Sequence, residues 1–184
     1  MQVQARKVSD IDWQAWKPTE KATLLFVIKG GRILLIHKKR GLGAGKINGP
    51  GGRVQPGETP KECAIREVEE ELLITARGVE RVGTVRFQFV DGYGIEAEVF
   101  TARGFDGTPT ETDEATPLWF DLNELPYDRM WPDDRIWMPL MFAGKKFTGQ
   151  FIFDGDKMLD AAVVEEGQGG AHARWNGHVQ VFCA

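Results

Sequence analysis

Cysteine, long apolar runs and excess positive charge are all scarce in this chain of 184 residues. Its two cysteines, Cys63 and Cys183, lie far apart and belong to no CxxC pair, so neither a disulfide framework nor a zinc site is expected. The longest apolar run, around Ala22–Ile28, is too short to cross a bilayer. Residues 1–10 carry two cations but no apolar stretch follows them, so no secretory signal is visible. We therefore expect a reduced, cytoplasmic protein without a membrane partner.

The charge balance limits the class of ligand. Lys and Arg number 23 against 27 Asp and Glu, a formal net charge of -4. Affinity for polymeric nucleic acid comes largely from neutralising phosphates, so a mildly acidic chain is a poor general binder of DNA or RNA. A small phosphate ester would need something other than net charge to hold it, and a divalent cation is the obvious candidate.

The pattern of apolar residues predicts a mixed α+β domain. Thr23–Ile28 and Arg32–His37 form an expected hairpin around a Gly-containing turn, and Val82–Val90 with Ile95–Arg103 a second one. The Gly-rich loop Lys38–Arg53 between them is expected to lack regular structure. Further expected elements are short strands at Leu118–Asp121 and Gln150–Phe153 and a helix at Asp133–Phe142. Strands and helices without a βαβ rhythm favour a mixed sheet packed on helices.

Length and composition fit one domain with two tails. The interpretation is an N-terminal extension over residues 1–20, a central domain over residues 21–164 and a C-terminal tail over residues 165–184. The tail contains Gly-Gln-Gly-Gly and no clear period, so we expect it to be flexible.

The strongest helix prediction covers Thr59–Leu73. Thr59 is a good N-cap, Pro60 suits the first helical position and Glu62 completes a capping box. One side of the helix is apolar and is expected to face the core; it carries Ala64, Ile65, Val68 and Leu72.

The same helix carries a dense arc of acids, Glu67, Glu70 and Glu71. Arg66 precedes Glu70 by four residues and can compensate only one of them. Like charges three and four residues apart destabilise an isolated helix, so the cluster needs a reason. A solvated acidic face is one interpretation, and a site for a hard divalent cation such as Mg²⁺ is the other.

The segment before the helix favours the metal interpretation. From Gly52 the chain reads G, five residues, Glu58, seven residues and then REVEEE, ending at Ile74. This resembles the signature of the Nudix hydrolases, G-x5-E-x7-R-E-U-x-E-E-x-G-U with U an aliphatic residue. One position departs, because Leu73 stands where the signature has its last glycine. The basic and Gly-rich run from Lys38 and the run Met130–Asp134 resemble, within that family, the MutT-related oxidised purine nucleoside triphosphatases.

The resemblance implies a Nudix fold, a mixed sheet sandwiched between helices, and hydrolysis of a nucleoside triphosphate to monophosphate and pyrophosphate. It implies Mg²⁺ as the cofactor, with Mn²⁺ as a possible substitute, and a small purine nucleotide as the partner of a monomer or homodimer. The implied metal ligands are Glu67, Glu70, Glu71, Glu114 and the carbonyl of Gly51. Arg66 and Glu58 would orient these acids. Either Glu71 or Glu114 could act as the base.

The implied substrate-binding residues form a larger set. They are Thr23, Lys38, Asn48, Gly51, Gly52, Arg53, Phe87, Phe89, Trp131, Pro132, Asp133 and Asp134. Trp131 offers a flat face on which a purine could stack, and Asn48 offers both a donor and an acceptor. If Asp133 and Asp134 shared a dry pocket, one could stay protonated and donate a hydrogen bond. The other interpretation of this pair is an exposed turn or a helix N-terminus, since Pro132 precedes it and acids suit a first helical turn. Leu42 and Ile47 depart from the pattern of this subfamily.

Two other functions stay open at this point. One is a Nudix hydrolase of another nucleoside diphosphate conjugate, such as a dinucleoside polyphosphate or a sugar nucleotide. The other is a Nudix-like module that senses a nucleotide without hydrolysing it, against which the complete set of acids argues. A P-loop is excluded because G-x4-GK[ST] is absent and Ile47 follows Lys46.

Overall fold

The computed structural model describes residues 4–167, 172–175 and 179–181. Their contacts divide the chain into two units, each of which contains one α-helix. The α1 unit comprises Ala22–Arg81 and Glu98–Trp131, and the α2 unit comprises Met1–Lys21, Val82–Ala97 and Pro132–Ala184.

The strands of the α1 unit are held by antiparallel ladders. β1 (Glu20–Lys29) pairs with β2 (Arg32–Lys38) and with β4 (Gly51–Arg53). β2 pairs in turn with β3 (Ile47–Asn48) and with β9 (Ala115–Asp121). These pairings bring the Gly51–Gly52 backbone beside Thr23 and Leu24.

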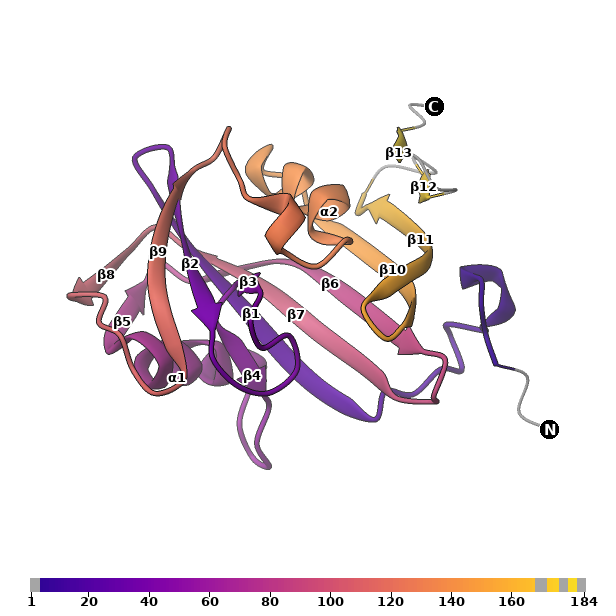
Figure 1. Ribbon diagram of the computed structural model, residues 1–184, viewed down its shortest axis with the longest axis horizontal. Coiled ribbons are helices and arrows are strands. Elements are labelled where there is room, and N and C mark those ends of the chain that lie inside the picture. Colours follow the sequence, from indigo (N-terminus) through magenta and orange to yellow (C-terminus); the bar gives the residue numbers. More distant parts are fainter. Residues whose placement is uncertain (1–3, 168–171, 176–178, 182–184) are drawn as a thin grey trace. The chain divides into compact units, whose positions relative to one another are not determined.

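Helix α1 (Pro60–Leu72) packs against β4, β5 and β9 of the same unit (Figure 1). β5 (Ile74–Arg77) follows the helix directly and pairs antiparallel with β8 (Gly104–Gly107). The apolar side of α1 joins a core of fully or almost fully buried residues: Leu25, Val27, Leu34, Ile36, Ala64, Val68, Leu72, Ile74, Ala76, Val79, Phe100, Ala102 and Ala115. The predicted core stripe of the helix is thus confirmed, with Ile65 partly buried at its border.

The strands of the α2 unit run in both directions. β10 (Phe147–Asp154) pairs parallel with β6 (Glu80–Phe89) and antiparallel with β11 (Lys157–Glu165). β12 (His172–Trp175) continues from β11, and β13 (Val179–Val181) from β12. β6 and β7 (Gly94–Ala102) contribute residues to both units. The sheet is mixed, as the sequence predicts.

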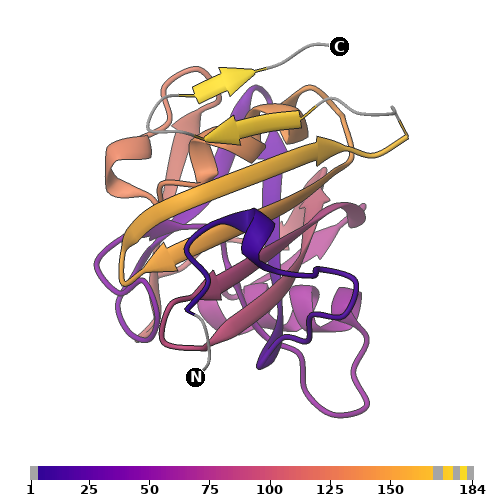
Figure 2. The same cartoon turned by 90° about the vertical axis from the view of Figure 1, so that its right-hand side faces the viewer.

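Helix α2 (Asp134–Phe142) packs on β10 and β11, with the Trp137 ring stacked 5.3 Å from the Phe147 ring. The N-terminal segment, which includes a short 3-10 helix at Val8–Asp10, also contacts β10 and β11 (Figure 2). The backbone N–H of Val8 donates to Asp160 over 2.7 Å. A second short 3-10 helix, Tyr127–Arg129, lies in the α1 unit.

The predicted hairpins, the helix after Thr59 and the helix near Asp133 are all present within a few residues of their expected ends. Each of these segments carries its own periodic apolar pattern, which is why sequence found them. The α+β prediction is confirmed. Within the described part of the chain, no helix is long and apolar enough to cross a membrane.

One prediction of irregular structure is wrong. β3 and β4 lie inside the Gly-rich loop Lys38–Arg53. They form because the neighbouring strands β1 and β2 supply their hydrogen bonds. β4 approaches β1 so closely that a Cβ at Gly51 would stand only 1.9 Å from the Thr23 carbonyl oxygen. β12 and β13 occupy part of residues 165–184, whose remaining residues 168–171, 176–178 and 182–184 lie outside the described chain.

Candidate active site

Helix α1 begins with the predicted capping box. The Glu62 N–H donates to the Thr59 hydroxyl oxygen over 3.2 Å, and the Thr59 N–H donates to the Glu62 carboxylate over 2.8 Å. These bonds satisfy N–H groups that have no partner inside the helix. They fix where the helix starts and therefore which way its acids point.

The helix ends at Leu73 in a left-handed conformation, with φ 57° and ψ 34°. This is the position at which the sequence has Leu in place of the expected glycine. The Leu73 N–H still donates to the Glu69 carbonyl, so the turn is made despite the substitution. Because Leu73 is 57% exposed, its side chain gains little from burial. Leu73 is also the one described residue other than glycine with a positive φ.

We expect Leu73→Gly to raise the free energy of unfolding by about 0.5–1 kcal/mol. Glycine removes a left-handed strain of about 1–2 kcal/mol but loses more chain entropy on folding. Urea unfolding of Leu73→Gly would measure the gain. Leu73→Ala is the control, because it shortens the exposed side chain but keeps the Cβ that causes the strain. An equal or lower midpoint for Leu73→Gly than for the native protein would contradict the prediction.

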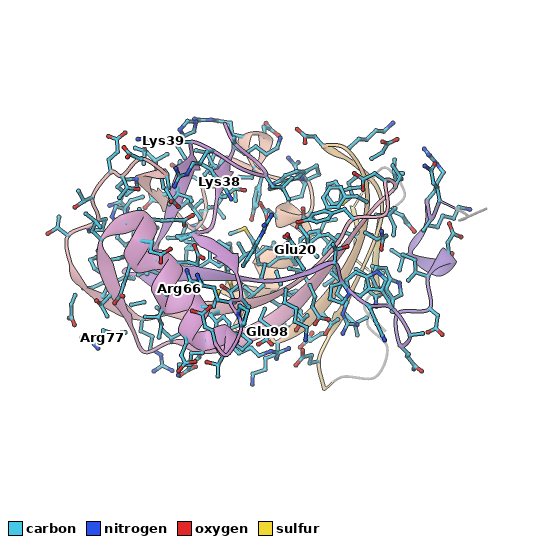
Figure 3. The ribbon with its side chains drawn as sticks, turned by 90° about the horizontal axis from the view of Figure 1, so that it is seen from below. Glu20, Lys38, Lys39, Arg66, Arg77 and Glu98 are labelled. Atoms are coloured by element: carbon cyan, nitrogen blue, oxygen red, sulfur yellow. The ribbon has the colours of Figure 1, made fainter. Side chains whose placement is uncertain are left out.

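Arg66 binds four neighbours on and before α1, where Figure 3 labels it. Nε and Nη2 donate to the two oxygens of Glu58 over 2.7 and 3.0 Å. Nη1 donates to Glu67 over 2.8 Å and to Glu70 over 3.1 Å. Nη2 also donates to the Arg53 carbonyl over 3.2 Å. The hydrogen bonds from Arg66 lower the pKa of Glu58 to about 2. Arg66 therefore ties the loop before the helix to two of its acids.

Glu71 is a buried carboxylate with 3% of its surface exposed. Its Oε2 accepts a hydrogen bond from the Gly51 N–H over 3.1 Å. Burial raises its pKa to about 8, and the charges of Glu67 and Glu114 push in the same direction against Lys38. Burial also raises the pKa of Glu67, again with a contribution from Glu114. The carboxylates of Glu67 and Glu71 are thus poorly solvated, and the more exposed Glu114 carboxylate lies near enough for its charge to act on both.

Gly51 and Gly52 allow β4 to approach both β1 and α1. A Cβ at Gly51 would clash with the Thr23 carbonyl, as described above. A Cβ at Gly52 would lie 2.3–2.5 Å from the carboxylate atoms of Glu67. No side chain fits at Gly52 unless Glu67 moves. The backbone at these two glycines therefore forms a cradle for the Glu67 and Glu71 carboxylates.

Glu114 lies at the turn that precedes β9. Its carboxylate forms an ion pair with Arg40, and its carbonyl accepts a hydrogen bond from the Lys39 N–H over 3.0 Å. The Lys39 ammonium is paired with Glu111 over 2.6 Å. Lys38 and Lys39 follow one another at the end of β2, where Figure 3 labels them.

No group of three or more His, Cys, Asp or Glu side chains in the described residues is arranged to hold a metal ion together. Glu67 and Glu70 both turn to Arg66, and Glu114 turns to Arg40. Each of these carboxylates commits one of its two oxygens to the arginine. Arg66 and Arg40 therefore set the orientation of these three carboxylates.

Asn48 and Trp131 meet around Gly43 in the α1 unit. Asn48 Nδ2 donates to the Gly43 carbonyl over 3.3 Å. A Cβ at Gly43 would lie 2.8 Å from Trp131 Nε1 and 3.3 Å from Asn48 Nδ2. The Lys46 ammonium lies 5.0 Å from the centre of the Trp131 ring. The structure thus brings together two residues of the predicted base site that are far apart in sequence.

Thr23, also predicted for the base site, is buried and its hydroxyl lies 3.3 Å from Cys63 Sγ. Cys63 is fully buried, as expected. Ile47, one of the two departures from the subfamily pattern, is fully buried in β3, whereas Leu42 is 51% exposed.

Asp133 immediately precedes α2 but does not cap it with its side chain. The carboxylate is buried instead, and Oδ2 accepts a hydrogen bond from Trp137 Nε1 over 2.9 Å. Oδ1 is buried and has no hydrogen-bond partner among the described residues. Burial raises the pKa of Asp133 to about 6. The pair does lie at a helix N-terminus, since Asp133 precedes α2 and Asp134 is its first residue, but the alternative of an exposed turn is wrong because Asp133 is 1% exposed and Asp134 8%.

Phe87 and Phe89 lie in β6 of the α2 unit. The Phe87 ring stacks on Phe151 at 5.5 Å, and Phe89 packs against Phe153 at 5.7 Å. Both rings therefore form part of the aromatic packing between β6 and β10. Pro132 is half-buried at the start of the same unit's last segment.

A model of the NUDIX domain matches residues 18–141 of the chain. The chain belongs to the Nudix family. It is similar to the oxidized purine nucleoside triphosphate hydrolase of Danio rerio, with 43% identity over 138 residues that cover 74% of this chain and 88% of that protein. The Mus musculus protein of the same name is 43% identical over 145 residues, which cover 78% and 93% of the two chains. The fold is similar to a Bacillus halodurans MutT protein, with a TM-score of 0.69 at 23% identity, covering 81% of this chain and 99% of that one.

Nudix hydrolases use divalent metal ions, and the donor chemistry of the α1 unit suits such an ion. Carboxylate and carbonyl oxygens are the donors that hard cations prefer, and the charges of Glu67 and Glu114 both raise the pKa of Glu71, after the larger effect of its burial. The Gly51–Gly52 backbone places the Glu67 carboxylate beside Gly52 and the Glu71 carboxylate on the Gly51 N–H, so two of these acids lie against one short strand.

Several residues that contact the predicted site residues were not predicted from sequence. Trp137 binds Asp133 and stands four residues after it, a helical spacing that could have suggested the contact. Gly43 and Lys46 contact Asn48 or Trp131, and Thr112 joins α1 to the turn of Glu114. The contacts of Lys46 with Trp131 and of Thr112 with Glu71 join segments far apart in the sequence, so no local signal marks these two residues.

Proposed function

We propose that the chain is a Mg²⁺-dependent pyrophosphohydrolase of oxidised or modified purine nucleoside triphosphates, of the 8-oxo-dGTP and 2-hydroxy-dATP type. It would release the monophosphate and pyrophosphate and so clear damaged precursors of DNA from the nucleotide pool. The observation that carries this proposal is the buried Glu71 beside Glu67 and the Gly51–Gly52 cradle. The names of the zebrafish and mouse relatives support the substrate class.

The acids of α1 would hold the cation in this proposal. Glu67, Glu70, Glu71, Glu114 and the Gly51 carbonyl are the proposed ligands, and Mg²⁺, or Mn²⁺ in its place, would neutralise the triphosphate and lower the pKa of the attacking water. Arg66 holds Glu67 and Glu70 through one oxygen each and thereby orients them. Either Glu71 or Glu114 would take the proton of the water.

Cations of the α1 unit would meet the phosphates. Lys38 already interacts with the charge of Glu71, so its ammonium lies near the acid cluster. We assign Lys38 and Arg53 to the triphosphate, because two positive side chains at the rim of an acidic site offset the repulsion that an anionic nucleotide would otherwise meet.

We assign recognition of the base to the residues that the sequence predicts for it. Trp131 provides a surface for stacking and Asn48 a donor and an acceptor, and Thr23, Phe87, Phe89, Pro132 and Asp134 complete the proposed set. Asp133 sets the strictest hydrogen-bonding requirement on the edge of the base. Its buried Oδ1 has no partner in the described structure, so a purine edge that pairs with it would remove the cost of an unsatisfied polar atom.

The proposal extends to the cellular setting. We place the enzyme in the cytoplasm, as a monomer or homodimer that binds no polymeric nucleic acid. The division into a 1–20 extension, a 21–164 hydrolase domain and a 165–184 tail stays a prediction.

A substrate panel tests the proposal directly. The panel compares kcat/KM for 8-oxo-dGTP, 2-hydroxy-dATP, O6-methyl-dGTP, dGTP, a dinucleoside polyphosphate and a sugar nucleotide, with Mg²⁺ and with EDTA. We expect at least one modified purine to exceed dGTP by about 10-fold or more, because the unsatisfied Asp133 oxygen rejects an edge that leaves it unpaired. A conjugate as the best substrate would replace the proposed substrate class, and no release of pyrophosphate or monophosphate from any compound would refute the enzyme.

A further inference from the structure

The turn at Glu111–Ala115 is fastened to two separate elements of the α1 unit through one residue, Thr112. Its hydroxyl donates to the backbone carbonyl of Glu71 over 2.8 Å. Its own carbonyl accepts a hydrogen bond from the Lys39 ammonium over 2.7 Å. Thr112 therefore connects the last turn of α1 to the end of β2.

The same hydroxyl also shapes the turn that carries Glu114. The N–H groups of Glu114 and Ala115 both approach the Thr112 hydroxyl oxygen at 3.3 Å. A second backbone bond, from the Thr112 N–H to the Ala115 carbonyl over 2.9 Å, closes the turn. A hydroxyl can donate once and accept twice, so all of its hydrogen-bonding capacity is used here.

This arrangement has a consequence for the acid cluster. Glu71 lies on the helix, whereas Glu114 lies 43 positions later, directly before β9, and its carbonyl accepts a hydrogen bond from the Lys39 N–H at the end of β2. The direct link between them is the Thr112 hydroxyl, which touches the backbone of both residues. A further backbone bond, from the Thr110 N–H to the Leu72 carbonyl over 2.9 Å, keeps the preceding residues beside the helix end.

We propose that Thr112 is a positioning residue, which sets the distance between the Glu114 carboxylate and the helix acids so that they can share one divalent cation. The inference rests on the proposed function, because it assigns Thr112 to the metal site of that reaction. Thr112 itself touches neither substrate nor metal in this assignment. It acts through the backbone of Glu71 and Glu114.

Three variants separate positioning from a merely structural role. Thr112→Val keeps the shape of the side chain and removes its hydroxyl, and Thr112→Ser restores the hydroxyl without the methyl group. Thr110→Val is the matched control, because the Thr110 hydroxyl is exposed and donates only to the nearby Thr108 carbonyl. The first measurement is binding of Mn²⁺ to the full-length protein without nucleotide, by titration calorimetry or by the loss of free Mn²⁺ signal in electron paramagnetic resonance.

We expect Thr112→Val to bind Mn²⁺ about 10-fold more weakly, in the range found when residues that orient metal ligands are removed. Its kcat with the best nucleotide of the panel should fall by a similar factor, with a smaller change in KM. Thr112→Ser and Thr110→Val should match the native protein in both measurements. Melting curves of all variants in EDTA show whether each is folded.

The outcomes distinguish failure of the role of Thr112 from failure of the proposed function. If the native protein binds Mn²⁺ and turns over a nucleotide but Thr112→Val matches it, or Thr112→Ser does not restore binding, the role of Thr112 is refuted and the proposed function stands. If the native protein neither binds Mn²⁺ nor turns over any nucleotide, the proposed function is refuted, and with it the metal site that Thr112 was to position. If Thr112→Val does not fold, Thr112→Ser decides: native Mn²⁺ affinity supports the assignment, and weakened affinity overturns it.

Discussion

Replacing Glu71 with Gln is expected to lower kcat by about 10²–10⁴-fold, the range for loss of a group that moves a proton in catalysis. Glu71 is the most buried acid of the cluster, and the Gly51 N–H holds one of its oxygens. Gln keeps the size of the side chain and can still accept that hydrogen bond. It removes the negative charge and the ability to take a proton. Steady-state hydrolysis with Mg²⁺ measures the loss.

The stability of Glu71→Gln provides the control. In metal-free protein the folded-state pKa of Glu71, about 8, lies above its ordinary value of 4.5. Its contribution to stability is therefore full below about pH 4.5 and is lost as the pH rises through about 8. Gln cannot ionise, so the native protein should lose stability relative to Glu71→Gln over this range in EDTA. Near-normal turnover by a folded Glu71→Gln would remove Glu71 from the mechanism.

Gly52→Ala is expected to lower kcat/KM by about 100-fold. The added methyl group would lie 2.3–2.5 Å from the Glu67 carboxylate, so this carboxylate must move away from β4. A displacement of about 1 Å in a reacting group typically costs about 100-fold in rate. The φ angle of Gly52 is not positive, so the effect is steric and no backbone strain contributes. Kinetics and Mn²⁺ binding should both weaken.

Gly104→Ala is the matched control for Gly52→Ala. Gly104 lies at the start of β8 in the same unit, its φ angle is also not positive, and a Cβ there meets no atom within 4 Å. We expect this variant to keep native activity. Equal activities of Gly52→Ala and Gly104→Ala would show that the Gly52 cradle does not set the position of Glu67.

The arginine contacts explain how an acidic site can exist in the free protein. Arg66 places its guanidinium between Glu58, Glu67 and Glu70, and Arg40 pairs with Glu114. Glu58 binds Arg66 through both of its oxygens, whereas Glu67, Glu70 and Glu114 use one oxygen each. In the proposed mechanism the second oxygen of each metal ligand faces the cation. Each arginine thus orients a carboxylate and leaves one of its oxygens available to the metal.

The features that the sequence determined by itself arise from interactions between residues close together in the chain. The capping box at Thr59, the apolar stripe of α1, the spacing of Glu67, Glu70 and Glu71 and the two hairpins all follow from residues close together in the chain. The Nudix signature lies within one loop and one helix, so its residues share a frame that the helix geometry fixes. These features could be predicted because their interactions do not depend on distant pairing.

The tertiary structure decided the rest, because burial and pairing are properties of the whole fold. From the sequence, the Asp133 side chain could either be exposed at a helix N-terminus or be buried in a pocket. In the folded protein the surrounding packing buries it, and it makes no capping hydrogen bond. Sequence also treated β4 as loop, and pairing with β1 made it a cradle for Glu67. The link from Thr112 to Glu71 spans 41 positions, and no local pattern encodes it. A hydrogen bond across such a distance forms only once the chain has folded around it.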